Sequence, residues 1–190
     1  MPIEFAVATQ VTLPAQSRVT HLYAPVHLAD AFAIGLPPGA STDPELLARF
    51  LVAHQPAWVG TLTRVRDLIV ARFGLKTAAQ LATLAGDGHA RRIGIFKIYS
   101  VDETEIVLGE DDKHLDFRVS FLCSGGAAPD IGRRLTVSTV VHCHNLLGRA
   151  YIVVIAPFHR QVIKAGLRRA ADIGWPQAAA SPDLPCPSGE

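Results

Sequence analysis

Two segments in the second half of the chain alternate between apolar and polar residues, and this period of two constrains the fold more than any other feature. In residues 113–123, every odd-numbered position from Leu115 onward is apolar, whereas the even-numbered positions up to Ser120 are polar. Residues 135–143 repeat the pattern, with Leu, Val, Thr, Val and Cys at odd positions. Successive side chains of a strand point to opposite faces, so the pattern predicts two half-buried strands. The glycine-rich turn segment between them predicts an antiparallel pair.

The register of this pair decides which polar side chains meet. Apolar residues are odd-numbered on both strands, so paired positions sum to an even number, and the turn length favours 256. Such a register sets His114 opposite His142 and Asp112 opposite His144. Opposed β-carbons lie about 4.5–5.5 Å apart, close enough for these groups to share a proton or hold a divalent metal. The solvated back of a sheet carries the same residue types, and on that interpretation we predict no metal site.

Helical periodicity surrounds the strands. A capping box at residues 42–45 predicts a first helix, Pro56 opens a second, and residues 77–80 begin a short third. The last helix is expected from Leu146 to about Ala171, kinked at Pro157, with one apolar side formed by Leu147, Tyr151, Ile155, Phe158 and Val162. An early strand is expected to end near Leu36, and residues 93–101 and 104–109 are expected to form a hairpin.

These elements predict one α+β domain, in which a curved antiparallel sheet wraps a long C-terminal helix. A chain of 190 residues suits one domain. We place an N-terminal extension at residues 1–22, the domain at 23–174 and a disordered Pro-rich tail at 175–190.

Composition narrows the function classes. Apolar residues make up 49% of the chain and charged residues only 18%, against a usual share of about 25%, so we expect a ligand cavity, a homodimer face or both. The net charge of +1 and the scattered arginine pairs argue against nucleic acid as a partner. Three cysteines without a CxxC spacing fit a reducing cytoplasm, and no apolar run reaches the length of a membrane span.

Several strings resemble a known family. They are HLADAF at 27–32, GEDDKHLDFR at 109–118, LGRAY at 147–151 and PFHR at 157–160, and they are similar to bacterial domain-of-unknown-function family 2867. The resemblance covers about residues 23–171. It implies proteins that occur alone or behind NAD(P)-binding domains, with no established reaction or catalytic residues. The order of elements also resembles the helix-grip layout of START-like and Bet v 1-like domains.

Three functional hypotheses follow. Signatures for nucleotide binding, serine hydrolysis and zinc ribbons are missing from the sequence, and we predict no cofactor. The leading hypothesis is a cytoplasmic domain that binds a small, largely apolar molecule between sheet and last helix, lined by Trp58, Phe96, Phe117, Phe121, Tyr151 and Phe158. The second is an acid–base or metal-assisted enzyme of cyclase, isomerase or hydrolase type that uses Asp112, His114, His142 and His144, with His159 in reserve. The third is an oligomeric interaction module.

Overall fold

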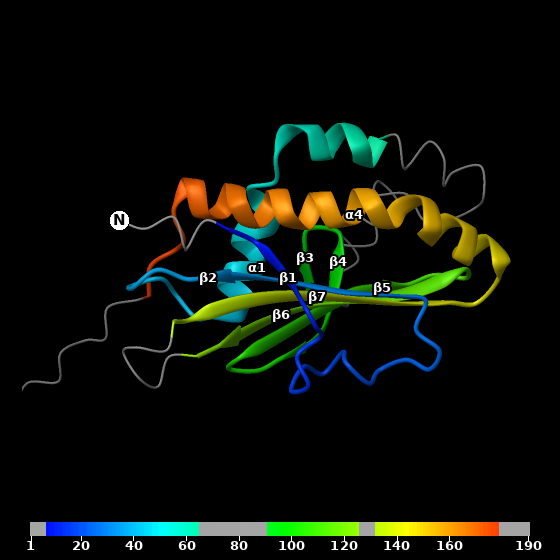
Figure 1. Ribbon diagram of the computed structural model, residues 1–190, viewed down its shortest axis with the longest axis horizontal. Coiled ribbons are helices and arrows are strands. Elements are labelled where there is room, and N and C mark those ends of the chain that lie inside the picture. The colour runs from blue at the N-terminus through cyan, green and yellow to red at the C-terminus, as the bar shows by residue number, and fades with distance from the viewer. Residues whose placement is uncertain (1–6, 65–90, 126–131, 179–190) are drawn as a thin grey trace, which may run out of the picture.

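The computed structural model describes residues 7–64, 91–125 and 132–178, and these build an α+β fold around a seven-stranded antiparallel sheet. The strands follow the spatial order β1-β2-β7-β6-β5-β4-β3. Figure 1 shows the long helix α4 along one face of the sheet and the segment between β1 and β2 along the other. The predicted fold class is therefore confirmed. The elements are β1 (Thr9–Val11), β2 (Leu28–Gly35), α1 (Pro44–Ala53), β3 (Arg92–Ile93), β4 (Phe96–Val101), β5 (Glu105–Asp111), β6 (Leu115–Ser124), β7 (Arg134–Cys143) and α4 (Leu146–Ile173).

The predicted strand pair is present as β6 and β7, but its register was wrong by two residues. Leu115 pairs with Cys143 and Asp116 pairs with His142, so paired positions sum to 258. A two-residue shift leaves every side chain on its predicted face, and only the cross-strand neighbours change. In the observed register, the apolar runs 115–123 and 135–143 lie side by side over their full length, which maximises their cross-strand contact.

One face of the sheet carries the helices and the main core. Asp43 caps α1 by accepting hydrogen bonds from the amides of Glu45 and Leu46, as the capping signal predicted. Helices α1 and α4 both pack on this helix-facing side. The core there consists of side chains from β2, β5, β6, β7 and the two helices, including Phe32, Ile34, Leu47, Ile106, Leu108, Leu135 and Leu167.

Helix α4 is continuous through Pro157, but it is rotated relative to the predicted apolar side. Its buried residues in the first half are Gly148, Ile152 and Ala156, whereas Phe158 is 48% exposed. A β-carbon on Gly148 would lie 2.2 Å from the His114 carbonyl oxygen. Gly148 therefore faces the sheet because the start of the helix approaches the backbone of the β5–β6 turn closely.

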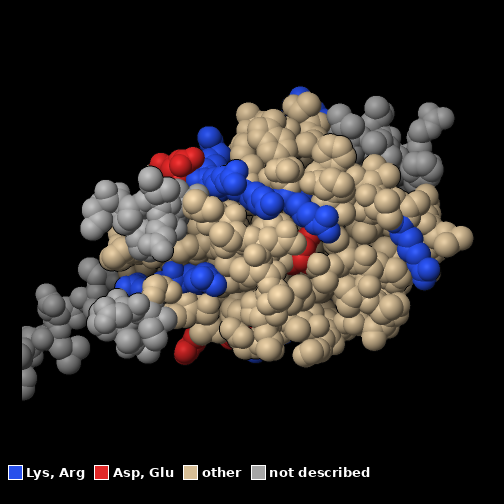
Figure 2. All heavy atoms as spheres, in the orientation of Figure 1, with Lys and Arg blue, Asp and Glu red and all other residues tan. Residues whose placement is uncertain are grey.

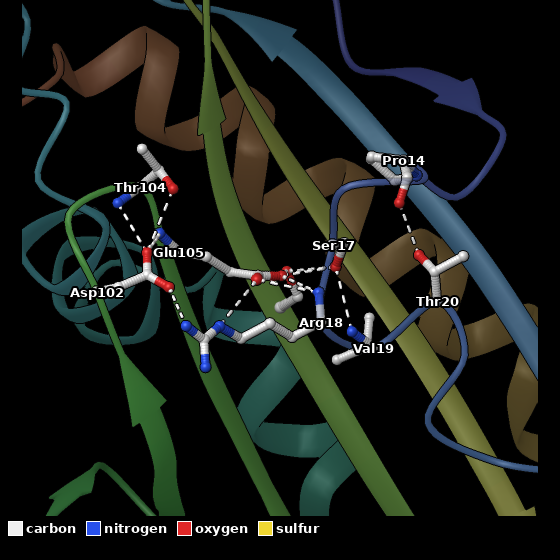
Figure 3. A network of polar contacts seen from close by, with 9 residues as sticks. Pro14, Ser17, Arg18, Val19, Thr20, Asp102, Thr104 and Glu105 are labelled. Atoms are coloured by element: carbon white, nitrogen blue, oxygen red, sulfur yellow. Dashed lines mark hydrogen bonds and ion pairs between the residues drawn. The ribbon is translucent and has the colours of Figure 1, made fainter.

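The other face of the sheet, which we call the back face, is not solvated as the sequence suggested. The segment that follows β1 runs along it and buries Val19 against Val107 and Val140. Glu105, with a side chain only 3% exposed, anchors this segment (Figure 3). Its carboxylate accepts hydrogen bonds from the hydroxyls of Ser17 and Ser120 and from the amide of Arg18. Residues 7–22 thus form an integral layer of the described fold.

The chain after α4 packs further than expected. Trp175 is 4% exposed and belongs to the main core, and the amide of Ala178 donates to the carbonyl of Gly39. Residues 175–178 therefore belong to the folded domain and not to a disordered tail. Residues 57–64 are helical, in agreement with the predicted second helix. The rest of that helix, the predicted third helix and residues 179–190 lie outside the described residues.

Candidate functional site

The four predicted catalytic residues do not meet as expected. His144 lies across from His114 and pairs through Nε2 with Asp116 at 3.1 Å. Asp112 lies in the β5–β6 turn, where its amide donates to Leu115. The predicted opposition of His114 to His142 and of Asp112 to His144 is wrong, because the two-residue register shift changed each neighbour.

The structure builds a different imidazole cluster on the back face. His142 lies between His144 and His27, with ring centroids 5.2 and 5.3 Å away. The His142 Nδ1–H donates to the Pro25 carbonyl at 2.7 Å, and His27 Nδ1 accepts from the Cys143 amide at 3.0 Å. Burial lowers the pKa of His27, and the nearby Arg149 and His142 lower it further. In the part of the chain that the structure describes, no three His, Cys, Asp or Glu side chains are arranged to hold a metal ion.

A second back-face cluster lies next to these histidines. The guanidinium of Arg118 lies 3.5 Å from the centroid of the Tyr99 ring and pairs with Asp111 at 2.8 Å. The Tyr99 hydroxyl donates to the same carboxylate at 2.7 Å, and burial raises the pKa of Tyr99 above its usual range. The Arg118 guanidinium and the Asp111 carboxylate already pair with each other. This cluster therefore joins the neighbouring strands β4, β5 and β6.

The predicted ligand-lining aromatic residues divide into three groups. Trp58 and Phe158 are exposed, at 42% and 48%. Phe121 is 6% exposed and lies in the packed core. Phe96, Phe117 and Tyr151 are partly exposed on the helix-facing side, and the rings of Phe96 and Phe117 meet edge to face at 5.9 Å. The six residues therefore differ in exposure, and Phe96, Phe117 and Tyr151 keep part of their surface accessible on the helix-facing side.

Phe96 and Phe117 belong to an apolar floor on the helix-facing side of the sheet. We define the apolar floor as Phe96, Ile98, Phe117 and Val119, from β4 and β6. All four are partly exposed, although the strands on either side of β6 bury their helix-facing apolar residues almost completely. The described helices therefore leave these four side chains incompletely covered, although each packs against a buried cluster.

A buried carboxylate lies beside this floor. Asp30 is on β2 opposite Thr139 of β7, and Thr139 is itself opposite Val119. The Asp30 side chain is 1% exposed, with Arg160 Nε 3.3 Å from its Oδ2 and His159 Nε2 3.5 Å from its Oδ1. The same His159 nitrogen lies 3.1 Å from the Thr139 hydroxyl. Among the described residues, Asp30 Oδ1 has no hydrogen-bond partner.

A second, largely buried ion pair joins β3 and β5. Arg92 and Glu110 are 3.0 Å apart, and each side chain is 11% exposed. Glu110 is on β5 directly opposite Phe117. Three strand spacings of about 4.8 Å separate β5 from β2, and Phe117 and Val119 of β6 lie between the Glu110 strand and the Asp30 strand.

Sequence reasoning missed Asp30, although a signal was present. Asp30 alternates with Leu28, Phe32 and Ile34, so it occupies an inward position of a strand whose other inward residues are apolar. A charged residue at such a position is rarely buried unless it is paired. Arg160 and His159 were not identifiable as its partners, because they follow about 130 residues later in the chain.

A small recess lies at another end of the sheet. Its volume is about 370 Å³, and its lining includes Thr42, Thr104, Cys123 and Arg133. Cys123 is a free, buried thiol, and burial raises its pKa to about 12. The thiol is protonated at neutral pH and is not a nucleophile, so this recess has no reactive group comparable to the Asp30 cluster.

Comparison with known proteins assigns the family. Residues 22–166 match a family described as "Protein of unknown function (DUF2867)". The chain belongs to this family. The DUF2867 match contains Asp30, the apolar floor, His159 and Arg160, and it leaves out β1 and Ser17. No curated protein and no solved structure matches the chain.

A helix that spans a membrane must be both long and apolar. None of the described helices combines the length and the hydropathy needed to cross a bilayer. Basic side chains form a row along α4 (Figure 2), where Arg160, Lys164 and Arg168 recur at every fourth residue. Apart from this row, the face shown in Figure 2 carries few charges.

Proposed function

We propose that the protein binds a small, largely apolar molecule on the helix-facing side of the sheet. The observation that carries this proposal is the apolar floor: four apolar side chains of β4 and β6 remain partly exposed, whereas the helix-facing apolar residues of the strands β5 and β7 beside β6 are buried. Small-molecule sites are concave and mostly apolar, with few polar groups that orient the ligand. Phe117 and Val119 supply such apolar surface, and their neighbour Thr139 leads to the polar cluster at Asp30.

The flanking charges shape the expected ligand. Asp30 is balanced by Arg160, and Glu110 by Arg92. Because these charges are already paired, a strongly charged ligand would leave a buried charge uncompensated, which is costly. A molecule with an apolar body and one neutral polar group fits this arrangement better, since the body covers the floor and the polar group reaches one of the pairs.

Titration with an uncharged hydrophobic dye such as Nile red, followed by competition with fatty alcohols of graded length, tests this proposal. We expect saturable binding that weakens several-fold in Phe117→Ala and Val119→Ala. Val140→Ala is the matched control, because Val140 lies on the neighbouring strand and faces the back of the sheet. Binding that does not saturate, or equal weakening in the control, would contradict the proposal.

An acid–base reaction at Asp112, His114, His142 and His144 stays a prediction. The part that involves His142 and His144 is supported by their cluster with His27 beside Asp116. Homodimerisation also stays a prediction. The large exposed apolar residues Leu146, Val153 and Val154 on α4 would supply a contact surface, and light scattering of Val153→Asp against the parent protein would test it.

A further inference from the structure

The cluster around Asp30 has a feature that the packing of sheet and helix does not require. A carboxylate with a 1% exposed side chain lies in the sheet, and both of its oxygens are approached by side chains from one turn of α4. One oxygen, Oδ1, has His159 as its nearest cationic or hydrogen-donating neighbour in the described structure. Buried carboxylates usually have their hydrogen bonds satisfied, so a loosely paired one marks a candidate functional site.

The carboxylate determines which nitrogen of His159 carries the proton. Nε2 of His159 faces both the Asp30 carboxylate and the Thr139 hydroxyl, at 3.5 and 3.1 Å, and because a carboxylate only accepts hydrogen bonds, this arrangement favours the tautomer with hydrogen on Nε2. In the neutral ring, the lone pair then lies on Nδ1. No described residue forms a hydrogen bond with this nitrogen. His159 is therefore held as a base with its basic nitrogen turned away from Asp30.

Exposure separates the roles of these residues. A bound molecule cannot reach Asp30, whereas the His159 side chain is 21% exposed and the Arg160 side chain 43%. Arg160 uses Nε for Asp30, and no described residue contacts its two Nη groups. The His159 imidazole and the Arg160 guanidinium, with its Nη donors unused, thus lie next to each other. Asp30 contacts both from the sheet.

We propose that His159 is a general base that acts on a carbon acid bound at the apolar floor, with Asp30 as its positioning residue. The proposal rests on the proposed ligand site, and it specifies the substrate class as an apolar carbonyl compound with an acidic hydrogen on the adjacent carbon. Nδ1 takes this proton, and the C–H electron pair moves into the carbonyl to give an enolate. The Nη groups of Arg160 stabilise the enolate oxygen. The imidazolium then returns the proton to a carbon of the same molecule, so no oxidant or second reactant is consumed.

The apolar probe 5-nitrobenzisoxazole tests the base without knowledge of the natural substrate. A base removes its C3 proton, the N–O bond breaks, and a coloured phenolate forms. We expect saturable acceleration above the buffer rate, and a loss of about 100-fold or more in His159→Gln, in the range typical of a general base. His54→Gln is the matched control, because His54 is an exposed histidine at the end of α1 and should leave the rate unchanged.

Dye binding and NMR separate the ways in which the proposal can fail. Nitrogen-15 shifts of the parent protein should show His159 protonated on Nε2 and unprotonated on Nδ1, and Asp30→Asn should give a mixture of tautomers. If the dye binds but the probe is not turned over, or if His159 is protonated on Nδ1, the general-base assignment is wrong while the ligand site stands. If the dye does not bind saturably, the ligand site itself is wrong. The tautomer measurement on the parent protein does not depend on any variant folding.

Discussion

Replacement of Glu105 by alanine tests how the N-terminal segment is held on the back face. The Glu105 carboxylate accepts hydrogen bonds from Ser17, Ser120 and the Arg18 amide, and Figure 3 shows the contacts with Ser17 and Arg18. The substitution leaves the Ser17 and Ser120 hydroxyls, 4% and 0% exposed, without this acceptor.

The expected loss follows from the donors left behind. Each buried donor without its acceptor costs about 1–3 kcal/mol, and water entering the space vacated by the side chain offsets part of the three costs. We therefore expect the free energy of unfolding to fall by about 3–5 kcal/mol in Glu105→Ala. Glu103→Ala is the control, since Glu103 is exposed two residues earlier, and a surface change of this kind costs less than about 0.5 kcal/mol.

Urea unfolding followed by circular dichroism measures the total loss, and amide hydrogen exchange locates it. We expect faster exchange first at the amides of Thr20 and Leu22, whose hydrogen bonds close the turn after Ser17. A loss below about 1 kcal/mol would show that burial of Val19 alone holds the segment. Equal acceleration of exchange in every strand would show that the segment does not open separately.

Four further measurements test the assignment of buried and exposed positions. Phe117→Ala should cost about 1–3 kcal/mol and Phe121→Ala about 3–5 kcal/mol in urea unfolding, because Phe117 is partly exposed and Phe121 is not; equal costs would place Phe117 in a closed core. Trp175→Ala should cost about 3–5 kcal/mol, whereas a disordered tail would give no change. The lowered pKa of His27 means that the unfolded chain binds its proton more readily, so stability should fall as the pH drops below 6.5, and less so in His27→Gln. Cys123 should react with thiol reagents only on unfolding, and rapid labelling of the native protein would contradict its burial.

The strands were predictable because alternation is a local signal. It placed the side chains of β6 and β7 on the correct faces. The two apolar runs are equally long, and the observed register is the one in which they overlap completely. The turn length instead favoured a register shifted by two residues. The overlap is the better guide, because cross-strand apolar contact stabilises the sheet whereas a long turn adapts at little cost.

The rotation of α4 was not predictable from residue size. Large apolar residues such as Leu147 and Phe158 suggested the buried side, but the helix packs closely enough that Gly148 and Ala156 face the sheet. The backbone that α4 approaches at Gly148 is the carbonyl of His114, just before β6. A periodicity argument considers each helix alone, so it cannot detect a neighbour that excludes large side chains.

The back face was misjudged because its cover comes from distant sequence. Ser17 meets Glu105 across 88 positions, and neither residue belongs to a motif that would indicate the pairing. A buried glutamate at an outward strand position is indistinguishable from a solvated one until the covering segment is known. Asp30 differs, because its inward position among apolar residues is already visible in the sequence.

The residues that cover the back face and those that line the helix-facing side therefore come from different parts of the chain. Ser17 and Val19, which seal the back face, precede the DUF2867 match at residues 22–166, whereas Asp30, Phe117 and His159 all lie within it. On the back face, the Glu105 carboxylate has its donors and Arg118 has its carboxylate, so its polar groups are used for attachment. On the helix-facing side, apolar surface and the basic nitrogen of His159 remain available. If a shared activity exists in the family, the helix-facing side is where the matched part of this chain has the chemistry for it.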